Sequence, residues 1–428
     1  MKLTNEDSLG DTVIKGGYCI GCGVCAGLAP AEYAIVLNEY GLFQAEERLN
    51  DPEVGEKVSK ICPFSNNAKS EKELSEEFLT DARLFTFEVG KFIECYAGRV
   101  VEDSVYQASS SGGIGRWFLS KLLSLGEVDY VVHVIDNKSE QVGELIYKFS
   151  IARTEEDVFN SAKSAYYPVE MSHVIRFILE NPGRYAITGV PCFIKAIRNL
   201  SLVEPVVRDR IRFTVGIVCG HLKGAFYAEM IGWQLGVKPD FLCGLDFRVK
   251  VPGKKANDKG VRAVSSVNCK EKSSIRTVRE IFGTGYAQGY FKNNACDYCD
   301  DVLAETADIS IGDAWLPEYL DASTSIVVVR NKKIKEILEN GIQESELRLE
   351  SISAGRVAES QAGGLRHRRD GLQYRLYLKR KRNEWFPVKR VEPKKKHLSW
   401  RRRWVLRLRM EFTQKSFVHF KDAKAKDD

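Results

Sequence analysis

Three closely spaced cysteines near the amino terminus have the residue type and spacing of metal ligands. Cys19, Cys22 and Cys25 follow one another with two residues between each pair in a glycine-rich stretch, and Cys62 begins a Cys-Pro pair. Thiolates at this spacing, completed by a distant Cys-Pro, are typical of a [4Fe–4S] cluster. A zinc knuckle is the alternative, but zinc motifs usually come as two separate Cys-x2-Cys pairs. The pattern therefore predicts one iron–sulfur cluster bound by these four cysteines.

Another Cys-x2-Cys pair, Cys296 and Cys299, is ambiguous by itself, because it suits zinc, redox chemistry or half of a cluster. Cys192 and Cys219 each follow a strand-like stretch directly. In a parallel sheet the carboxyl ends of the strands share one edge, where ligands bind. Buried core cysteines are the alternative, but both residues stand beside Gly or Pro turns. We predict that these four thiols form a second metal site.

The elements that must position these cysteines alternate between strands and helices. Apolar, strand-like runs at 128–135, 184–190 and 212–218 are separated by helix-like segments at 171–183 and 193–200. This alternation predicts parallel βαβ units and the α/β fold class, with an α+β character over the whole chain. Right-handed crossovers then bring the loops that follow the strands to one edge of the sheet.

Several longer motifs occur together in one order: CIGCGVC with the later CP, ASSSGG, GRYAITGVPCFIKAIR, GIVCGH and ACDYCDDVLAETADISIGDAW. In these motifs, over roughly residues 15–330, the sequence resembles the family of coenzyme F420 hydrogenase/dehydrogenase beta subunits. That family includes the 7-hydroxymethyl chlorophyll a reductases. The basic end of the chain departs from those branches and resembles bacterial members, some of them encoded among surface-polysaccharide genes.

The resemblance implies FAD, a ferredoxin-like cluster and a second [4Fe–4S] cluster near the flavin. It gives the second cluster the ligands Cys192, Cys219, Cys296 and Cys299. We expect four regions: a ferredoxin-like domain at 1–70, a catalytic domain for FAD and the second cluster at 85–330, a helical connector at 331–365 and a basic tail at 366–428.

The small-residue loop in ASSSGG also suits a cofactor phosphate. Glycines allow close backbone approach, hydroxyls donate hydrogen bonds, and a following helix favours negative charge at its start. For Tyr166 the alternative is a tyrosine that only packs, and for Arg248 it is a solvated arginine on a strand. The residues expected at the flavin are Ser110, Ser111, Gly112, Gly113, Lys163, Tyr166, Arg248 and Asp313.

The expected activity is that of a ferredoxin-dependent flavin and iron–sulfur reductase. Reduced ferredoxin supplies electrons to the first cluster, and they pass through the second cluster and FAD to an organic substrate. His133 and His221, at or near strand ends, are the candidate proton donors. An electron-transfer subunit without its own substrate and a zinc-bearing binding protein are the alternative functions.

Charge divides the chain at its basic tail, where residues 366–428 hold 22 Lys and Arg against 7 Asp and Glu. Trp400, Trp404, Leu408 and Phe412 recur every four residues among arginines, which predicts a helix on an anionic membrane surface. Docking on the protein's own body or on a second copy is the alternative. Nucleic acid binding is not expected, because the basic residues are not part of a recognised nucleic-acid-binding motif.

Eleven cysteines without a visible secretory signal favour metal ligation over disulfides. We expect a cytoplasmic protein whose tail contacts the inner face of the membrane.

Overall fold

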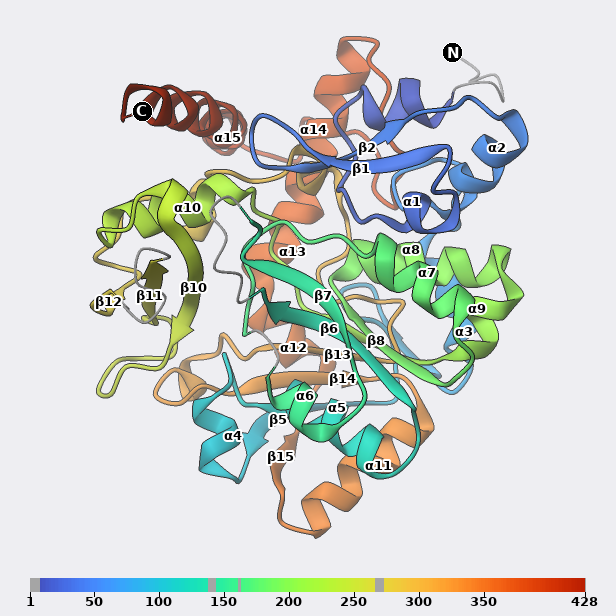
Figure 1. The fold of residues 1–428 in the computed structure, drawn as a ribbon, viewed down its shortest axis with the longest axis vertical. Coiled ribbons are helices and arrows are strands. Elements are labelled where there is room, and N and C mark those ends of the chain that lie inside the picture. Colours follow the sequence, from blue (N-terminus) through green and yellow to red (C-terminus); the bar gives the residue numbers. More distant parts are fainter. Residues whose placement is uncertain (1–7, 138–143, 161–162, 266–272, 428) are drawn as a thin grey trace.

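An eight-stranded mixed sheet runs through the centre of the molecule (Figure 1). The computed structural model describes residues 8–137, 144–160, 163–265 and 273–427. Four neighbouring strands, β6, β8, β9 and β13, are parallel, and the others join antiparallel. In spatial order the strands are β15 (Leu347–Ser351), β5 (Glu94–Val100), β14 (Ser325–Val329), β13 (Ile309–Asp313), β9 (Ile211–Ile217), β8 (Tyr185–Gly189), β6 (Tyr130–Asp136) and β7 (Tyr147–Ala152).

The parallel strands are apolar because helices cover both faces of the sheet. Every residue of β8 is buried, and α8 (Pro191–Val203) begins after a single intervening residue. The predicted α/β class with parallel βαβ units is confirmed in this part of the sheet. The helices packed around the sheet are α4 (Asp103–Gln107), α5 (Ile114–Ser124), α6 (Glu155–Phe159), α7 (Ser172–Glu180), α8 (Pro191–Val203), α9 (Pro205–Arg210), α11 (Lys332–Gln343) and α12 (Ala354–Ser360).

The stretch expected to be a helical connector also contributes a strand. Between α11 and α12, β15 pairs antiparallel with β5 and forms one edge of the large sheet. Leu347 is buried while its neighbour Arg348 is exposed, the alternation of a strand with one covered face.

The amino-terminal region packs against α7 and α8 (Figure 1). Val58 and Ile61 share one hydrophobic core with Ile175 and Ile197 from the body. Its elements are α1 (Val24–Leu28), the hairpin β1 (Tyr33–Leu37) and β2 (Phe43–Glu47), α2 (Pro52–Ile61) and α3 (Glu71–Phe78), followed by the hairpin β3 (Leu84–Thr86) and β4 (Gly90–Phe92).

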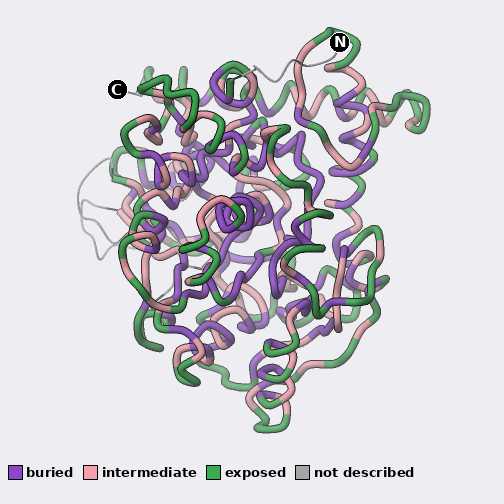
Figure 2. The backbone as a smooth tube through the Cα atoms, turned by 90° about the vertical axis from the view of Figure 1, so that its right-hand side faces the viewer, coloured by how far each residue is buried: buried purple, intermediate pink, exposed green. Residues whose placement is uncertain are grey.

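A smaller antiparallel sheet lies beside the large one and holds the end of the chain. Phe417 and Phe420 of the last helix pack into its hydrophobic core with Phe226 and Phe291. Buried residues occupy the interior of the molecule, and exposed ones line its outer turns (Figure 2). The elements of this region are β10 (Leu242–Val249), β11 (Gly260–Ser265), β12 (Arg276–Thr277), α10 (Ala225–Gln234) and α15 (Trp400–Asp427). Two further helices, α13 (Ala362–Arg368) and α14 (Asp370–Lys381), precede α15 and contribute to other hydrophobic cores.

Within the part of the chain that the structure describes, no helix has the length and apolar character needed to cross a bilayer.

Candidate functional site

The first cysteine set lies on a tight loop that depends on two glycines. Gly21 and Gly23 have φ values of 63° and 84°, in the left-handed region that favours glycine. A Cβ at Gly21 would lie 2.4 Å from the Cβ of Phe43, and one at Gly23 would lie 2.3 Å from Oε2 of Glu170. The loop therefore packs tightly against Phe43 and Glu170, and this packing keeps its cysteines close together.

The thiols of this first set lie close together, with Cys22 buried and Cys19, Cys25 and Cys62 half-buried. Burial raises the pKa of each, to about 12 for Cys62, and neighbouring thiols raise the pKa of Cys25 further. The backbone N–H groups of Gly21 and Ala45 donate to Sγ of Cys19 at 3.4 Å and 3.3 Å. Free thiolates are disfavoured here, yet N–H donors point at sulfur, which fits metal-bound sulfur.

The second cysteine set comes from three separate parts of the chain. Cys192 lies in the first turn of α8, Cys219 follows β9, and Cys296 and Cys299 lie in and after a short 3-10 turn at Asn294–Tyr298. Burial raises the pKa of Cys192, and the other three thiols raise it further, so the four are electrostatic neighbours. Strand-end placement correctly predicted that they meet; their ligation of a metal stays a prediction.

Neither set has the arrangement of a single-ion site. Among the described residues, no group of three or more His, Cys, Asp or Glu side chains could hold one metal ion. A four-iron cluster is held by four cysteines, which is the number that each set supplies.

The two cysteine sets meet at the loop that carries Cys296. Nδ2 of Asn293 donates to the carbonyl of Cys19 at 3.3 Å, and Nδ2 of Asn294 donates to that of Gly17 at 3.0 Å. The rings of Tyr18 and Tyr298 pack edge to face, 4.9 Å apart. The loop that carries the first cysteine set therefore packs directly against the loop that carries Cys296.

Four cations, which we call the basic cluster, gather near the Ser-Gly loop before α5: Lys163, Arg248, Lys250 and Lys259. Nζ of Lys250 donates to the carbonyls of Tyr106 and Ser111 at 2.5 Å and 3.1 Å. Burial, and then neighbouring cations, lower the pKa of Lys250 to about 7 and that of Lys259 to about 8. Such mutually repelling cations favour a bound anion.

Two carboxylates balance part of this charge. Arg248 forms a bidentate pair with Asp313 at 2.5 Å and 2.7 Å, and Lys163 pairs with Asp246 at 2.8 Å. The N–H of Ser164 donates to Oγ of Ser110, so the structure brings the predicted Ser-Gly loop to the same region as Lys163, Arg248 and Asp313. Sequence reasoning missed Lys250 and Lys259. Lys250 directly follows β10 and stands two residues after Arg248, the side-chain period of a strand, which was the available signal.

The glycines of the loop are needed for packing. A Cβ at Gly112 would lie 2.5 Å from the carbonyl oxygen of Gly98, and Gly113 has a φ of 86° at the start of α5. Oγ of Ser111 donates to the carbonyl of Thr324 at 2.9 Å. The Ser111 hydroxyl therefore holds the loop, rather than projecting freely towards a ligand.

Aromatic rings connect the second cysteine set with the basic cluster. Tyr286 stacks on His221 with ring centres 3.9 Å apart, and its ring centre is 5.9 Å from that of Tyr166. Tyr166 in turn packs against Phe247, the neighbour of Arg248 in β10. The candidate flavin site and the second cysteine set are therefore close in space.

The two predicted proton donors have different surroundings. His221 lies beside the second cysteine set, and burial, followed by the charge of Lys223, lowers its pKa well below the usual value. His133 lies on β6, where burial lowers its pKa to about 4. Both imidazoles are neutral near pH 7, so neither is the imidazolium acid that a proton donor would ordinarily use. Their catalytic role stays a prediction.

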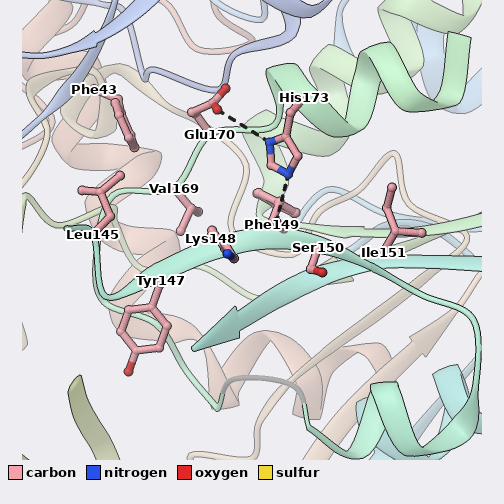
Figure 3. Close-up of a pocket in the computed structure, with 10 residues that line it drawn as sticks. All are labelled: Phe43, Leu145, Tyr147, Lys148, Phe149, Ser150, Ile151, Val169, Glu170 and His173. Carbon is pink, nitrogen blue, oxygen red and sulfur yellow. Dashed lines mark hydrogen bonds and ion pairs between the residues drawn. The ribbon is translucent and has the colours of Figure 1, made fainter. Parts of the chain in front are cut away.

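An open pocket of about 510 Å³ lies between β7 and the segment before α7 (Figure 3). Nε2 of His173 contacts the carbonyl of Phe149 at 3.0 Å, and Nδ1 lies 3.8 Å from Glu170. Glu170 and Phe43 line this pocket, and both also abut the glycines of the first cysteine loop. The pocket therefore opens beside the first cysteine set.

The segment from α13 to residue 390 closes over the second cysteine set, a feature that sequence reasoning missed. Arg390 contacts Glu305 at 2.8 Å and Asp300 at 3.3 Å, and Arg369 contacts Glu305 at 3.1 Å. Both carboxylates belong to the acidic run after Cys299. The acidic run and the basic tail carry opposite charges, and this was the sequence signal that could have predicted their contact.

Known proteins of similar sequence include three from Methanosarcina mazei and Methanocaldococcus jannaschii. One of the subunits of the F(420)H(2) dehydrogenase of Methanosarcina mazei is 21% identical over 72% of this chain and 78% of its own. The coenzyme F420-dependent sulfite reductase of Methanocaldococcus jannaschii is 23% identical over 79% of this chain and 48% of its own. An uncharacterized protein of M. jannaschii is 24% identical over 54% and 77%.

A solved structure shares the fold. It belongs to the F420-reducing [NiFe] hydrogenase complex from Methanosarcina barkeri, with a TM-score of 0.52 and 16% identity over 74% of this chain and all of that chain.

Two family profiles match consecutive parts of the sequence. Residues 95–176 match the amino-terminal part of the coenzyme F420 hydrogenase/dehydrogenase beta subunit, and residues 183–355 match its carboxyl-terminal part. These segments make up more than half of the chain, which therefore belongs to the family of coenzyme F420 hydrogenase/dehydrogenase beta subunits.

Proposed function

We propose that this protein is an iron–sulfur flavoprotein oxidoreductase that carries electrons from a reduced donor to an organic substrate. Its cofactors are two [4Fe–4S] clusters and FAD. The observation that carries the proposal is that two groups of neighbouring thiols meet at the loop that carries Cys296, with a basic cluster near the second group. The names of two relatives, a dehydrogenase subunit and a reductase, support the oxidoreductase class.

The residues present fit the clusters. Each group supplies four cysteines, and N–H groups reach sulfur in both, as in the donation from Leu222 to Sγ of Cys296 at 3.2 Å. When bound, the clusters and the flavin supply one- and two-electron transfer. The protein would hold the first cluster with Cys19, Cys22, Cys25 and Cys62, and the second with Cys192, Cys219, Cys296 and Cys299.

The residues near α5 fit the phosphates of FAD. The basic cluster has four cations against the two carboxylates of Asp246 and Asp313, and it lies at a helix start that follows two glycines. Lys250 and Lys259 would bind the phosphates, Arg248 would be fixed by Asp313, and Tyr166 would pack beside the ring system.

A protein donor such as reduced ferredoxin would deliver electrons at the pocket beside the first cysteine loop (Figure 3). Phe43 and Glu170 contact that loop and also line the pocket, so a donor seated there would approach the first set closely. The whole protein would act in the cytoplasm.

The alternative is an electron-transfer subunit that hands electrons to a partner enzyme. The name of the M. mazei relative, a dehydrogenase subunit, favours it. Flavin reduction by reduced ferredoxin, followed by reoxidation by a small molecule in the absence of other proteins, would favour the enzyme. Reoxidation that needs a partner protein would favour the electron-transfer role.

The test is anaerobic purification with iron, sulfide, zinc and flavin analysis. We expect brown protein with about eight irons, as two four-iron clusters require. Cys19→Ser and Cys296→Ser should each remove about half of the iron. Cys243→Ser, at a half-buried cysteine outside both sets, should keep it. Colourless protein with stoichiometric zinc would contradict the proposal.

A further inference from the structure

One arginine of the carboxyl-terminal segment lies directly on the second cysteine set. Arg368 ends α13, beyond the segments that match the family profiles, and its side chain is buried. Nη1 donates to Sγ of Cys299 at 2.5 Å, and Nη2 lies 3.8 Å from Sγ of Cys219. A guanidinium therefore faces two of the four thiols.

Backbone carbonyls fix the orientation of this guanidinium. Nη1 also donates to the carbonyl of Asp301, and Nη2 to that of Gly220, each at 2.6 Å. Nε of Arg368 is buried, and no hydrogen-bond acceptor for it lies among the residues that the structure describes. An unsatisfied donor in this place is suited to a sulfide or thiolate of a bound cluster.

Neighbouring buried side chains hold the segment in place. Arg375 donates to the carbonyl of Asp297 at 2.6 Å and to that of His367 at 2.8 Å. Arg369 pairs with Glu305 and donates to the carbonyl of Phe87. The position of Arg368 is therefore determined by several independent contacts.

We infer that Arg368 is a positioning residue that makes the second cluster easier to reduce. The inference rests on the proposed function, because it requires a cluster on Cys219 and Cys299. A reduced cluster carries one more negative charge than an oxidised one, so a nearby cation stabilises the reduced form more. Arginine keeps its charge when buried, and charge and hydrogen bonds to sulfur both set cluster potentials.

The test is a redox titration of the full-length protein, purified anaerobically and followed by electron paramagnetic resonance. Arg368→Gln should lower the ratio of reduced to oxidised second cluster at a fixed potential by at least tenfold, which corresponds to about 59 mV for one electron. Arg368→Lys keeps the charge but loses the planar fork, so its shift should be smaller. The first cluster serves as an internal reference.

Arg366→Gln is the control, because Arg366 is an exposed arginine of the same helix and its replacement removes the same charge from α13. It should leave both potentials unchanged. If Arg368→Gln loses iron, Arg368→Met takes its place, because Met removes the charge but keeps a long side chain, and an unshifted potential in that variant overturns the inference.

An Arg368→Gln protein with full iron and an unchanged potential would also overturn the inference, while the proposed function would stand. Wild-type protein that binds no second cluster would overturn both.

Discussion

At the scale of single residues, the first cysteine loop depends on positions without a side chain. At Gly23, an added Cβ would meet Oε2 of Glu170 at 2.3 Å and the backbone nitrogen of Ser172 at 2.8 Å. The backbone there is left-handed, so substitution adds conformational strain to the clash.

We expect Gly23→Ala to lower the free energy of unfolding by about 1–3 kcal/mol and to remove the iron of the first cluster. Urea unfolding and iron analysis measure the two effects. Gly55→Ala is the control, because a Cβ at this helical position meets nothing within 4 Å. A Gly23→Ala protein with full iron and wild-type stability would contradict this account of the loop.

The lysines of the basic cluster would give the proposed binding of FAD a pH dependence. The pKa of Lys250 is lowered to about 7 and that of Lys259 to about 8, by burial and then by neighbouring cations. Below these values both are charged and attract phosphate, and above them the charge is lost. The affinity for FAD should therefore fall as pH rises through this range, by up to about tenfold per pH unit for each proton.

Fluorescence titration of the flavin-free protein with FAD at several pH values measures this dependence. Lys250→Met should weaken binding and flatten the profile, whereas Lys255→Met, at an exposed lysine nearby, should do neither. Affinity that increased with pH would rule out these lysines as phosphate ligands.

At the scale of elements, the carboxyl-terminal segment is attached to the second cysteine loop by buried ion pairs. Asp300 and Glu305 are almost completely buried, and Arg390 contacts both. Removing one member of such a group leaves a buried charge without its partner.

Arg390→Ala should therefore destabilise the protein by about 3 kcal/mol, measured by urea unfolding under anaerobic conditions. Arg382→Ala removes a pair with Glu384 whose arginine is 65% exposed, so its effect should be below about 1 kcal/mol. Equal effects of the two substitutions would argue against a structural role for the buried group.

Sequence reasoning predicted the elements with strong periodicity. The strand around Ile187 is apolar throughout because both faces of the sheet are covered, and strand-end placement of Cys192 and Cys219 predicted that they meet. Arg368 was not predicted, because an arginine in a basic tail looks like a solvated one. Arg368 is buried because it contacts groups that are distant in the sequence, and a local sequence pattern cannot predict such contacts.

At the scale of the whole molecule, the last helix has two different faces. Leu406, Phe417 and Phe420 are buried against the body, so the alternative of docking on the body is observed. Trp400 and Trp404 are 67% and 59% exposed, with Arg401 and Arg407 exposed beside them. The outward face keeps the combination that suits an anionic membrane.

We expect the protein to sediment with vesicles of phosphatidylglycerol and phosphatidylcholine, less so at high salt because screening weakens the attraction. Replacing Trp400 and Trp404 by Ser should reduce binding several-fold. Phe85→Ser removes an equally exposed ring on β3 and serves as the control. Equal binding to neutral vesicles, or no effect of the tryptophan changes, would exclude a membrane role for this face.

The position of α13 over the second cysteine set also determines an order of assembly. The ribosome completes Cys192, Cys219, Cys296 and Cys299 before it reaches Arg368, whose side chain then lies across two of the thiols. Iron and sulfide of the proposed second cluster would then have to arrive before that arginine docks. The carboxyl-terminal segment would cover the metal centre last, and its docking would be the final step of maturation.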